Sequence, residues 1–123
     1  MNEKLLDVLK HEGVVSIISW GSADEPHVTN TWNSYIVVKD DRFLIPAAGM
    51  TSTEADVVKN PRVKVTLGAR EVEGFNGYQG TGFRIEGTAE FISEGAEYDE
   101  MFEKYPFLKR VLAIRVNDAK QLL

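Results

Sequence analysis

The sequence predicts a mainly β protein with small helices, built as an antiparallel barrel. Several short segments alternate apolar and polar residues in the way that is typical of half-buried strands. Most of these segments are separated by turn residues. The sequence lacks the regular strand–helix–strand alternation that is typical of a parallel sheet. The 123 residues suit one domain, spanning residues 1–123, with enough chain for an independent core.

The chain is expected to begin with a short helix and a strand. Asn2 can cap the helix, an apolar stripe follows it, and Gly13 is the expected stop. Residues 14–20 then alternate between the two faces of a strand. This helix is too short to be stable alone, so we expect it to pack against the barrel.

The middle of the chain is expected to form two strands and a helix. A long strand over residues 27–39 ends at an Asp-Asp turn, and a short strand over residues 42–47 follows it. Thr51 and Glu54 match a capping box, in which Thr51 caps the helix and Glu54 binds back to its start. The helix is expected to reach about Lys59.

The C-terminal half is expected to add three strands and a polar helix. The expected elements are a strand over 62–69, a glycine-rich loop over 71–82, a strand over 83–92, a helix over 95–105 and a strand over 111–116. Asn117 and Asp118 are expected to cap a final helical turn that ends at Leu123.

Composition excludes several classes of function. The 14 Lys and Arg residues against 19 Asp and Glu residues give a formal charge of −5, which argues against a nucleic-acid-binding protein. The sequence has no cysteine, so disulfides, thiolate metal sites, iron–sulfur clusters and cysteine nucleophiles are ruled out. The two histidines, His11 and His27, lack the spacing of metal ligands, and we expect no metal. Without a membrane-length apolar run or a signal peptide, we expect a cytoplasmic protein with no membrane partner.

Two stretches of the sequence are candidates for the walls of a ligand site. Residues 30–35 carry amides, hydroxyls, an indole and a phenol where a core strand carries Val and Ile. A structural hydrogen-bond network would satisfy these groups, and so would a flat heterocycle with carbonyl and N–H edges; the residues favour both interpretations equally. Gly49 and the hydroxyls of residues 51–53 at a helix start suit a phosphate, although an ordinary helix cap has the same composition.

Other chemistries have weaker signals, and no residue is predicted to be catalytic. Ser34 lacks the Gly-x-Ser-x-Gly context of a serine hydrolase. Gly80 and Gly82 lack the strand-then-helix setting of a dinucleotide loop, so a turn is the better interpretation. The carboxylates between Glu97 and Glu103 are most simply a solvated helix face.

Several motifs together resemble one known family. The motifs are VTNTWNSY at residues 28–35, Gly49-Met50, Thr53-Glu54-Ala55, Thr66-Leu67-Gly68 and Gly80-Thr81-Gly82-Phe83. They closely resemble the small bacterial FMN-binding proteins, which are split-barrel flavoproteins related to pyridoxamine 5′-phosphate oxidase. The similarity runs nearly from end to end, and the NTWNSY stretch is its most specific part.

The resemblance implies a six-stranded antiparallel split barrel that forms a homodimer with one FMN per subunit. It implies that residues 31–35 surround the flavin, that residues 49–53 surround its phosphate, and that Leu123 covers the flavin of the partner subunit. It also places Glu12 near the flavin. The candidate cofactor-binding residues are therefore Asn30, Thr31, Trp32, Asn33, Ser34, Tyr35, Gly49, Met50, Thr51, Ser52, Thr53, Gly82 and Leu123.

The chain departs from the family in three places. The family has a lysine where this chain has Ser52, so the expected phosphate site lacks one cation, and Arg62, Arg70 or another residue has to replace it. Phe107 stands where the family has a second tryptophan near the flavin. The glycine-rich loop is one residue longer, with Tyr78 and Gln79 in place of a single proline.

Three functions follow from the resemblance. The first is an electron-transfer flavoprotein with an unknown redox partner, which the lack of an evident acid or base beside Trp32 favours. The second is an FMN-dependent oxidoreductase, acting on a pyridoxamine-phosphate-like substrate or as an NAD(P)H:flavin reductase. A phosphorylated substrate would need a basic pocket, which Arg62, Lys64, Arg70 and Arg84 would have to form. The third is a module that binds a flavin without turnover.

Overall fold

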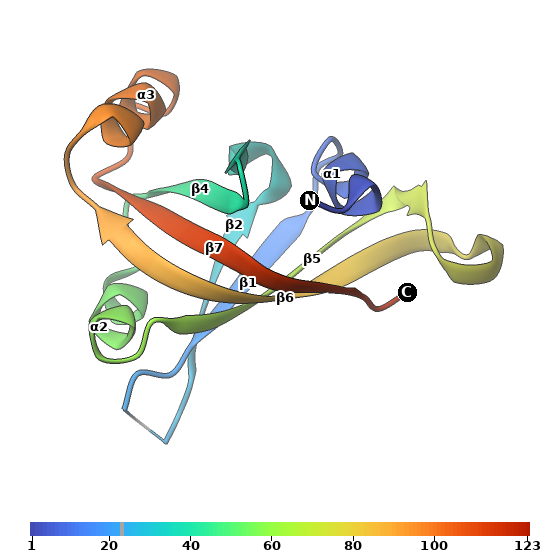
Figure 1. The fold of residues 1–123 in the computed structure, drawn as a ribbon, viewed down its shortest axis with the longest axis horizontal. Helices are drawn as coiled ribbons and strands as arrows, with labels where there is room; N and C mark the ends of the chain where they lie inside the picture. Colours follow the sequence, from blue (N-terminus) through green and yellow to red (C-terminus); the bar gives the residue numbers. More distant parts are fainter. Residues whose placement is uncertain (23) are drawn as a thin grey trace.

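A computed structural model describes residues 1–22 and 24–123. One strongly curved antiparallel sheet forms the body of the protein, with its strands in the order β2-β1-β5-β6-β7-β4-β3 (Figure 1). The strands are β1 (Val14–Ser19), β2 (His27–Trp32), β3 (Val37–Lys39), β4 (Arg42–Ala47), β5 (Arg62–Glu73), β6 (Gln79–Ile92) and β7 (Arg110–Gln121). The helices are α1 (Glu3–Val8), α2 (Thr51–Lys59) and α3 (Ala96–Lys104), with 3-10 turns η1 (Asn33–Tyr35) and η2 (Phe75–Gly77).

The sheet has to curl because its two edges are neighbours in the sequence. β2 and β3 lie at opposite ends of the strand order, yet only η1 and Ile36 separate them along the chain. The predicted class, a mainly β antiparallel split barrel with small helices, is confirmed. The described residues form seven strands rather than six because the strand expected over residues 27–39 breaks at η1.

The first helix is confirmed, but it is shorter than predicted. The Asn2 side chain accepts a hydrogen bond from the backbone N–H of Leu5 (3.1 Å), as expected of a cap. The helix ends at Val8, so Gly13 is not its stop. Gly13 instead allows close packing, because a Cβ there would lie 2.5 Å from the carbonyl oxygen of Gly68.

The predicted capping box of α2 is wrong, although the helix begins and ends where expected. Met50 is the N-cap residue, in the left-handed region (φ 62°), and it makes no side-chain cap. Glu54 does not bind back to the helix start. It pairs instead with Arg110 of β7, whose Nε lies 3.0 Å from the Glu54 Oε1. A cation from a distant strand therefore replaces the local partner that the motif predicts.

The predicted C-terminal helical turn is also wrong. β7 continues to Gln121 and pairs with β6 between Val111 and Gln121, with an irregularity between Glu86 and Gly87. Asn117 donates to the Thr88 hydroxyl on β6 (2.8 Å) instead of capping a helix. The loop expected over residues 71–82 is likewise mostly strand, because β5 and β6 extend into a long hairpin around η2 (Figure 1).

Two apolar clusters lie on the two sides of the curved sheet. The larger fills the barrel, where Phe43 and Phe83 are fully buried and α1 contributes Leu5 and Val8 at one end. The smaller cluster lies under α3, around Met101. Burying an aliphatic side chain in such a core contributes roughly 1.5 to 3 kcal/mol, so these clusters hold the helices on the sheet.

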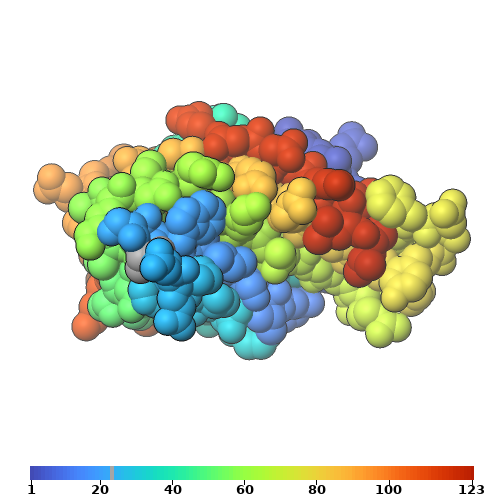
Figure 2. All heavy atoms as spheres, turned by 90° about the horizontal axis from the view of Figure 1, so that it is seen from below, coloured from blue at the N-terminus to red at the C-terminus, as the bar shows by residue number. Residues whose placement is uncertain are grey.

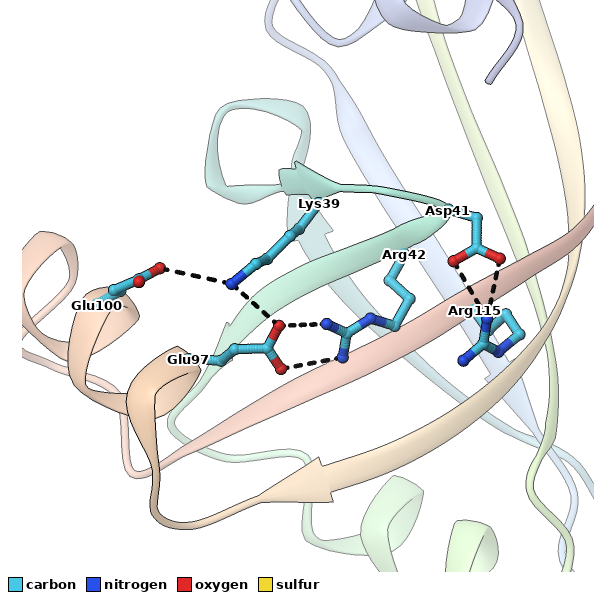
Figure 3. A network of polar contacts seen from close by, with 6 residues as sticks. All are labelled: Lys39, Asp41, Arg42, Glu97, Glu100 and Arg115. Carbon is cyan, nitrogen blue, oxygen red and sulfur yellow. Dashed lines mark hydrogen bonds and ion pairs between the residues drawn. The ribbon is translucent and has the colours of Figure 1, made fainter.

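Ion pairs fix α3 to the strands beneath it (Figure 3). Both terminal nitrogens of Arg42 on β4 bind the Glu97 carboxylate, and Lys39 lies 3.4 Å from the same group. The Arg42 guanidinium lowers the pKa of Glu97, against the opposing effect of burial. Arg115 holds Asp41 in the adjoining turn, at 2.9 Å.

Candidate functional site

A cavity of about 400 Å³ lies between β2, the segment after β4 and the segment after α3. We call it the aromatic cavity. Six of the predicted site residues line it: Asn30, Thr31, Trp32, Tyr35, Gly49 and Met50. The other lining residues are Val14, Thr29, Pro46, Ala48 and Phe107. The two stretches singled out in the sequence therefore do form two walls of one cavity.

Aromatic side chains dominate one side of this cavity. Trp32 lines it with 46% of its surface exposed, which is unusual for a tryptophan in a folded domain. Tyr35 and Phe107 also line it, with ring centroids 5.5 Å apart. Tyr105 packs behind both rings and donates to the Ser34 carbonyl oxygen (3.0 Å), and burial raises the pKa of its hydroxyl. These contacts hold the aromatic wall in place.

A second hollow of about 250 Å³ continues the aromatic cavity toward the N-terminus of α2. The two share Thr29 and Met50, so they are neighbouring parts of one depression. We call the second part the hydroxyl groove. Its lining includes His27, Val28 and the predicted residues Thr51, Ser52 and Thr53. The free N–H groups of a helix start and three hydroxyls suit an anion.

The turn between the two parts has an unusual backbone. Met50 is one of the few non-glycine residues with positive φ, a conformation that costs about 1 kcal/mol or more and is common at functional sites. Gly49 precedes it, and a Cβ built there would meet no atom within 4 Å. The packing of the protein itself therefore does not require a glycine at this position.

Arg110 is a cation that contacts residues on both sides of the start of α2, and sequence reasoning missed it. Its guanidinium donates to the Gly49 carbonyl oxygen, pairs with Glu54 and lies over the Phe91 ring, with 14% of the side chain exposed. Its Nε is buried without a hydrogen-bond acceptor, so the Glu54 contact is an ion pair only. No local pattern could have identified it, because 61 residues separate it from Gly49.

The basic residues considered from the sequence do not converge on this site. Arg62 lies over the Trp20 ring, and Arg70 lines a different cavity. Lys64 lies opposite Glu86 across the β5–β6 ladder, at 3.1 Å, and Arg84 lies 3.7 Å from Glu86 on the same strand, β6. Their charges are therefore used at three separate places.

Asn33 does not line the aromatic cavity. Its side chain is buried, with 1% of the residue exposed, and its amide nitrogen lies within hydrogen-bonding distance of three carbonyl oxygens, those of Val8 (3.5 Å), His11 (2.9 Å) and Gly68 (3.1 Å). The backbone N–H of Asn33 donates to Gly13 (2.9 Å). Asn33 thus joins α1, the loop after it and β5. At this residue, the polar side chain belongs to a structural hydrogen-bond network and not to a ligand site.

Ser34 is likewise occupied by a protein contact. Its hydroxyl donates to Glu12 Oε2 (2.7 Å), and its backbone N–H donates to Glu12 Oε1 (3.1 Å). The Ser34 hydroxyl, followed by the Ser34 N–H, lowers the pKa of the Glu12 carboxyl. Glu12 therefore holds η1 at the point where the long predicted strand breaks.

We expect Glu12→Gln to remove a pH-dependent part of the stability. A carboxyl whose pKa is lowered by folding stabilises the protein above its unfolded pKa, and that contribution is lost as the pH falls through the folded value. The wild type should therefore be more stable than the variant at neutral pH, and the difference should vanish well below the ordinary Glu value of 4.5. Urea unfolding across this range measures it, and a difference independent of pH would contradict the assignment.

Gly82 and Leu123 lie outside the aromatic cavity. Both line a groove of about 370 Å³, which shares Val14 with the aromatic cavity. Leu123 also lines a cavity of about 360 Å³ with Glu12, and its carbonyl oxygen accepts a hydrogen bond from Thr81 (2.8 Å). In Figure 2 the C-terminal residues lie against the β5–β6 hairpin. Leu123 therefore lies beside the aromatic cavity rather than over it.

The described residues show two further properties. Within residues 1–22 and 24–123, no cluster of three or more His, Asp or Glu residues is arranged to bind a metal ion. In the same part of the chain, no helix has the length and apolar character needed to cross a membrane.

Comparison with known proteins assigns the family. A family model described as pyridoxamine 5′-phosphate oxidase matches residues 1–122. The chain belongs to the pyridoxamine 5′-phosphate oxidase family. It is also similar to a protein named FMN-binding protein from Nitratidesulfovibrio vulgaris (strain DSM 19637 / Miyazaki F). That relative is 47% identical over 118 residues, which cover 95% of this chain and 94% of the relative.

Solved structures similar to this pyridoxamine 5′-phosphate oxidase family member agree on the fold. HupZ from Group A Streptococcus matches with a TM-score of 0.80 and 18% identity, over 99% of this chain and 94% of that one. An FMN-binding protein from Syntrophomonas wolfei subsp. wolfei matches with a TM-score of 0.66 and 14% identity, over 89% and 76%. At these identities the likeness supports the fold alone.

Proposed function

We propose that this protein is an FMN-binding flavoprotein that transfers electrons, with residues 1–123 forming one FMN-binding domain. The observation that carries the proposal is the continuous depression in which an aromatic cavity leads into the hydroxyl groove at the start of α2. A flat ring system at one end and a phosphate at the other match this order of chemistry. The 47% identical relative is named FMN-binding protein, which supports the same cofactor.

The residues present fit an FMN. Trp32, Tyr35 and Phe107 would contact the isoalloxazine ring, and Asn30 and Thr31 carry the amide and hydroxyl groups that pair with polar ring edges and a ribityl chain. The N–H groups at the start of α2 and the hydroxyls of residues 51–53 would hold the phosphate. Along the depression, the lining residues therefore change from aromatic side chains to anion-binding groups. This order matches the order of the ring, the ribityl chain and the phosphate in FMN.

Arg110 is our candidate for the cation that offsets the missing lysine at Ser52. It donates to Gly49 and pairs with Glu54, two residues that flank the start of α2. Because Glu54 neutralises part of its charge, we expect Arg110 to strengthen phosphate binding less than an unpaired lysine would. Its main contribution is to hold the backbone of Gly49 at the junction of the two parts of the site.

The lining of the aromatic cavity favours an electron carrier over a substrate-specific oxidase. A bound FMN supplies the redox chemistry, and the protein supplies binding, orientation and exclusion of water. Among the described residues that line this cavity, Tyr35 is the one ionisable side chain, and no His, Lys, Asp or Glu is placed there as an acid or base. The electron donor and acceptor would therefore react with the exposed edge of the cofactor.

A homodimer is part of the proposal. Val14, Trp32 and Leu123 are about half exposed, and they line the aromatic cavity or the adjoining groove that contains Gly82 and Leu123. A two-fold partner would cover this apolar surface and bring its own Leu123 over the open side of the aromatic cavity. Leu123 would then cover the aromatic cavity of the other subunit, although it lies outside the cavity of its own subunit.

Titration of the purified protein with FMN tests the proposal. We expect a visible flavin spectrum, quenching of flavin fluorescence with one FMN per subunit, and a dimer in sedimentation at micromolar concentration. The bound flavin should be reduced and reoxidised without steady-state turnover of NAD(P)H or of pyridoxine phosphates. Failure to take up FMN would rule out the flavoprotein, and turnover of either substrate would rule out a pure carrier.

A further inference from the structure

We propose that Asp56 is a positioning residue, which fixes the anion-binding start of α2 against the β1–β2 hairpin and so sets the affinity for the phosphate of the cofactor. The inference rests on the proposed FMN function and extends it to a residue that does not line the aromatic cavity or the hydroxyl groove. The elements involved are α2, β1 and β2.

One carboxylate oxygen joins these three elements. The hydroxyl of Ser19 at the end of β1 donates to Asp56 Oδ2 (2.8 Å), and Nδ1 of His27 at the start of β2 lies 2.8 Å from the same oxygen. Ser19 is fully buried, and the Asp56 side chain is 9% exposed. Hydrogen bonds to a charged group at such a position are worth more than ordinary ones, because little water competes for them.

The carboxylate is held in its charged form and in a close-fitting place. The hydrogen bond from His27 is the largest effect that lowers the pKa of Asp56, and burial opposes it. Gly21, in the turn between β1 and β2, adopts φ 48°, and a Cβ there would lie 2.8 Å from Asp56 Oδ1. The backbone of the hairpin therefore packs directly on this side chain, and in Figure 2 the hairpin lies beside the chain of α2.

The two sides joined by Asp56 are the two sides of the hydroxyl groove. Asp56 follows Thr53 by three residues, so it lies one helical turn from the groove residues of α2. His27 lines the groove from β2, and Thr29 on the same strand lines both the groove and the aromatic cavity. Loss of the carboxylate would free the start of α2 to move relative to the strand that carries the ring-binding residues.

This arrangement predicts a selective effect on FMN relative to riboflavin, which has the same ring and ribityl chain but no phosphate. In Asp56→Ala the affinity for FMN should fall by about tenfold, the effect expected when hydrogen bonds to a charged group are lost. The affinity for riboflavin should change by less than about twofold. Asp56→Asn should fall between Asp56→Ala and the wild type, because its amide oxygen can still accept from Ser19.

Glu97→Ala is the matched control. It also breaks a partly buried carboxylate contact that anchors a helix, but no residue of α3 lines the hydroxyl groove. It should lower the melting temperature without changing the ratio of FMN to riboflavin affinity. A general loss of stability in Asp56→Ala would weaken both ligands equally, and that result would overturn the inference. If Asp56→Ala does not fold, an unchanged ratio in Asp56→Asn and in His27→Ala would overturn it.

The outcomes separate this inference from the proposed function. If the unaltered protein binds no FMN, the flavoprotein proposal fails and the inference falls with it. If the unaltered protein prefers FMN to riboflavin and the Asp56 variants keep the same preference, the flavoprotein proposal stands and only the positioning role fails. A preference that decreases from wild type through Asp56→Asn to Asp56→Ala supports both.

Discussion

Asn33→Ala is expected to destabilise the protein by about 3 kcal/mol, although the sequence places Asn33 in the middle of a candidate ligand site. Its amide nitrogen lies within hydrogen-bonding distance of carbonyl oxygens from α1, the following loop and β5. Alanine would leave these buried acceptors without their donor, and each unsatisfied group costs roughly 1 to 3 kcal/mol. The break between β2 and β3 would then lose the contact that fixes its position.

Urea unfolding of the cofactor-free protein measures this effect, with two variants for comparison. Asn33→Asp keeps the size of the side chain but turns a negative charge toward carbonyl oxygens, so it should destabilise at least as much as alanine at neutral pH. Ser34→Ala removes an exposed contact with Glu12 and should cost well under 1 kcal/mol. If Asn33→Ala has the same stability as the wild type, the structural role is contradicted and the ligand-binding role that the resemblance implies for Asn33 is favoured.

Gly49→Ala is expected to weaken FMN binding by about tenfold while leaving the stability of the cofactor-free protein unchanged. The backbone of Gly49 is not in the region that favours glycine, and no atom lies within 4 Å of an added Cβ, so the fold tolerates a methyl group. Gly49 nevertheless lines the aromatic cavity at its junction with the hydroxyl groove. A methyl group there would intrude on a ligand that passes from one part to the other, at about 1 to 3 kcal/mol for overpacking.

Larger side chains at position 49 give a more stringent test of this prediction. Gly49→Val and Gly49→Leu should weaken FMN binding further in that order, while their melting temperatures without FMN stay close to that of the wild type. Fluorescence titration and thermal unfolding of the same samples measure the two quantities. An affinity that does not depend on side-chain size would place the cofactor away from Gly49.

Local patterns predicted the elements that depend on local physics. The strand predicted after the Asp-Asp turn has the expected bounds, Arg42–Ala47, and α2 begins and ends close to where its hydroxyls and the following proline indicate. The Asn2 cap is confirmed for the same reason, because donor and acceptor lie three residues apart. Such features depend on neighbouring residues and not on the position of the rest of the chain.

The errors occur where distant residues compete with local signals. Residues 27–39 look like one strand, but Asn33 binds carbonyl groups up to 35 positions away and breaks it into two. Thr51 and Glu54 look like a capping box, but Arg110 takes Glu54. Asn117 looks like a helix cap, but pairing with β6 satisfies the backbone of this segment first.

The sequence by itself determined the class of fold, the family resemblance and the two stretches that form the walls of the cavity. Period-two alternation, turn residues and an unusual concentration of polar and aromatic side chains are properties of neighbouring residues. The tertiary structure decided which of those side chains face the cavity and which hold the fold. Asn30 and Trp32 of β2 line the cavity, whereas Asn33 lies in η1, where the chain leaves the sheet, and its buried side chain binds carbonyl groups of α1, the following loop and β5. Arg110 and Asp56 line neither part of the site, and contacts between elements far apart in the sequence join them to the segments that do.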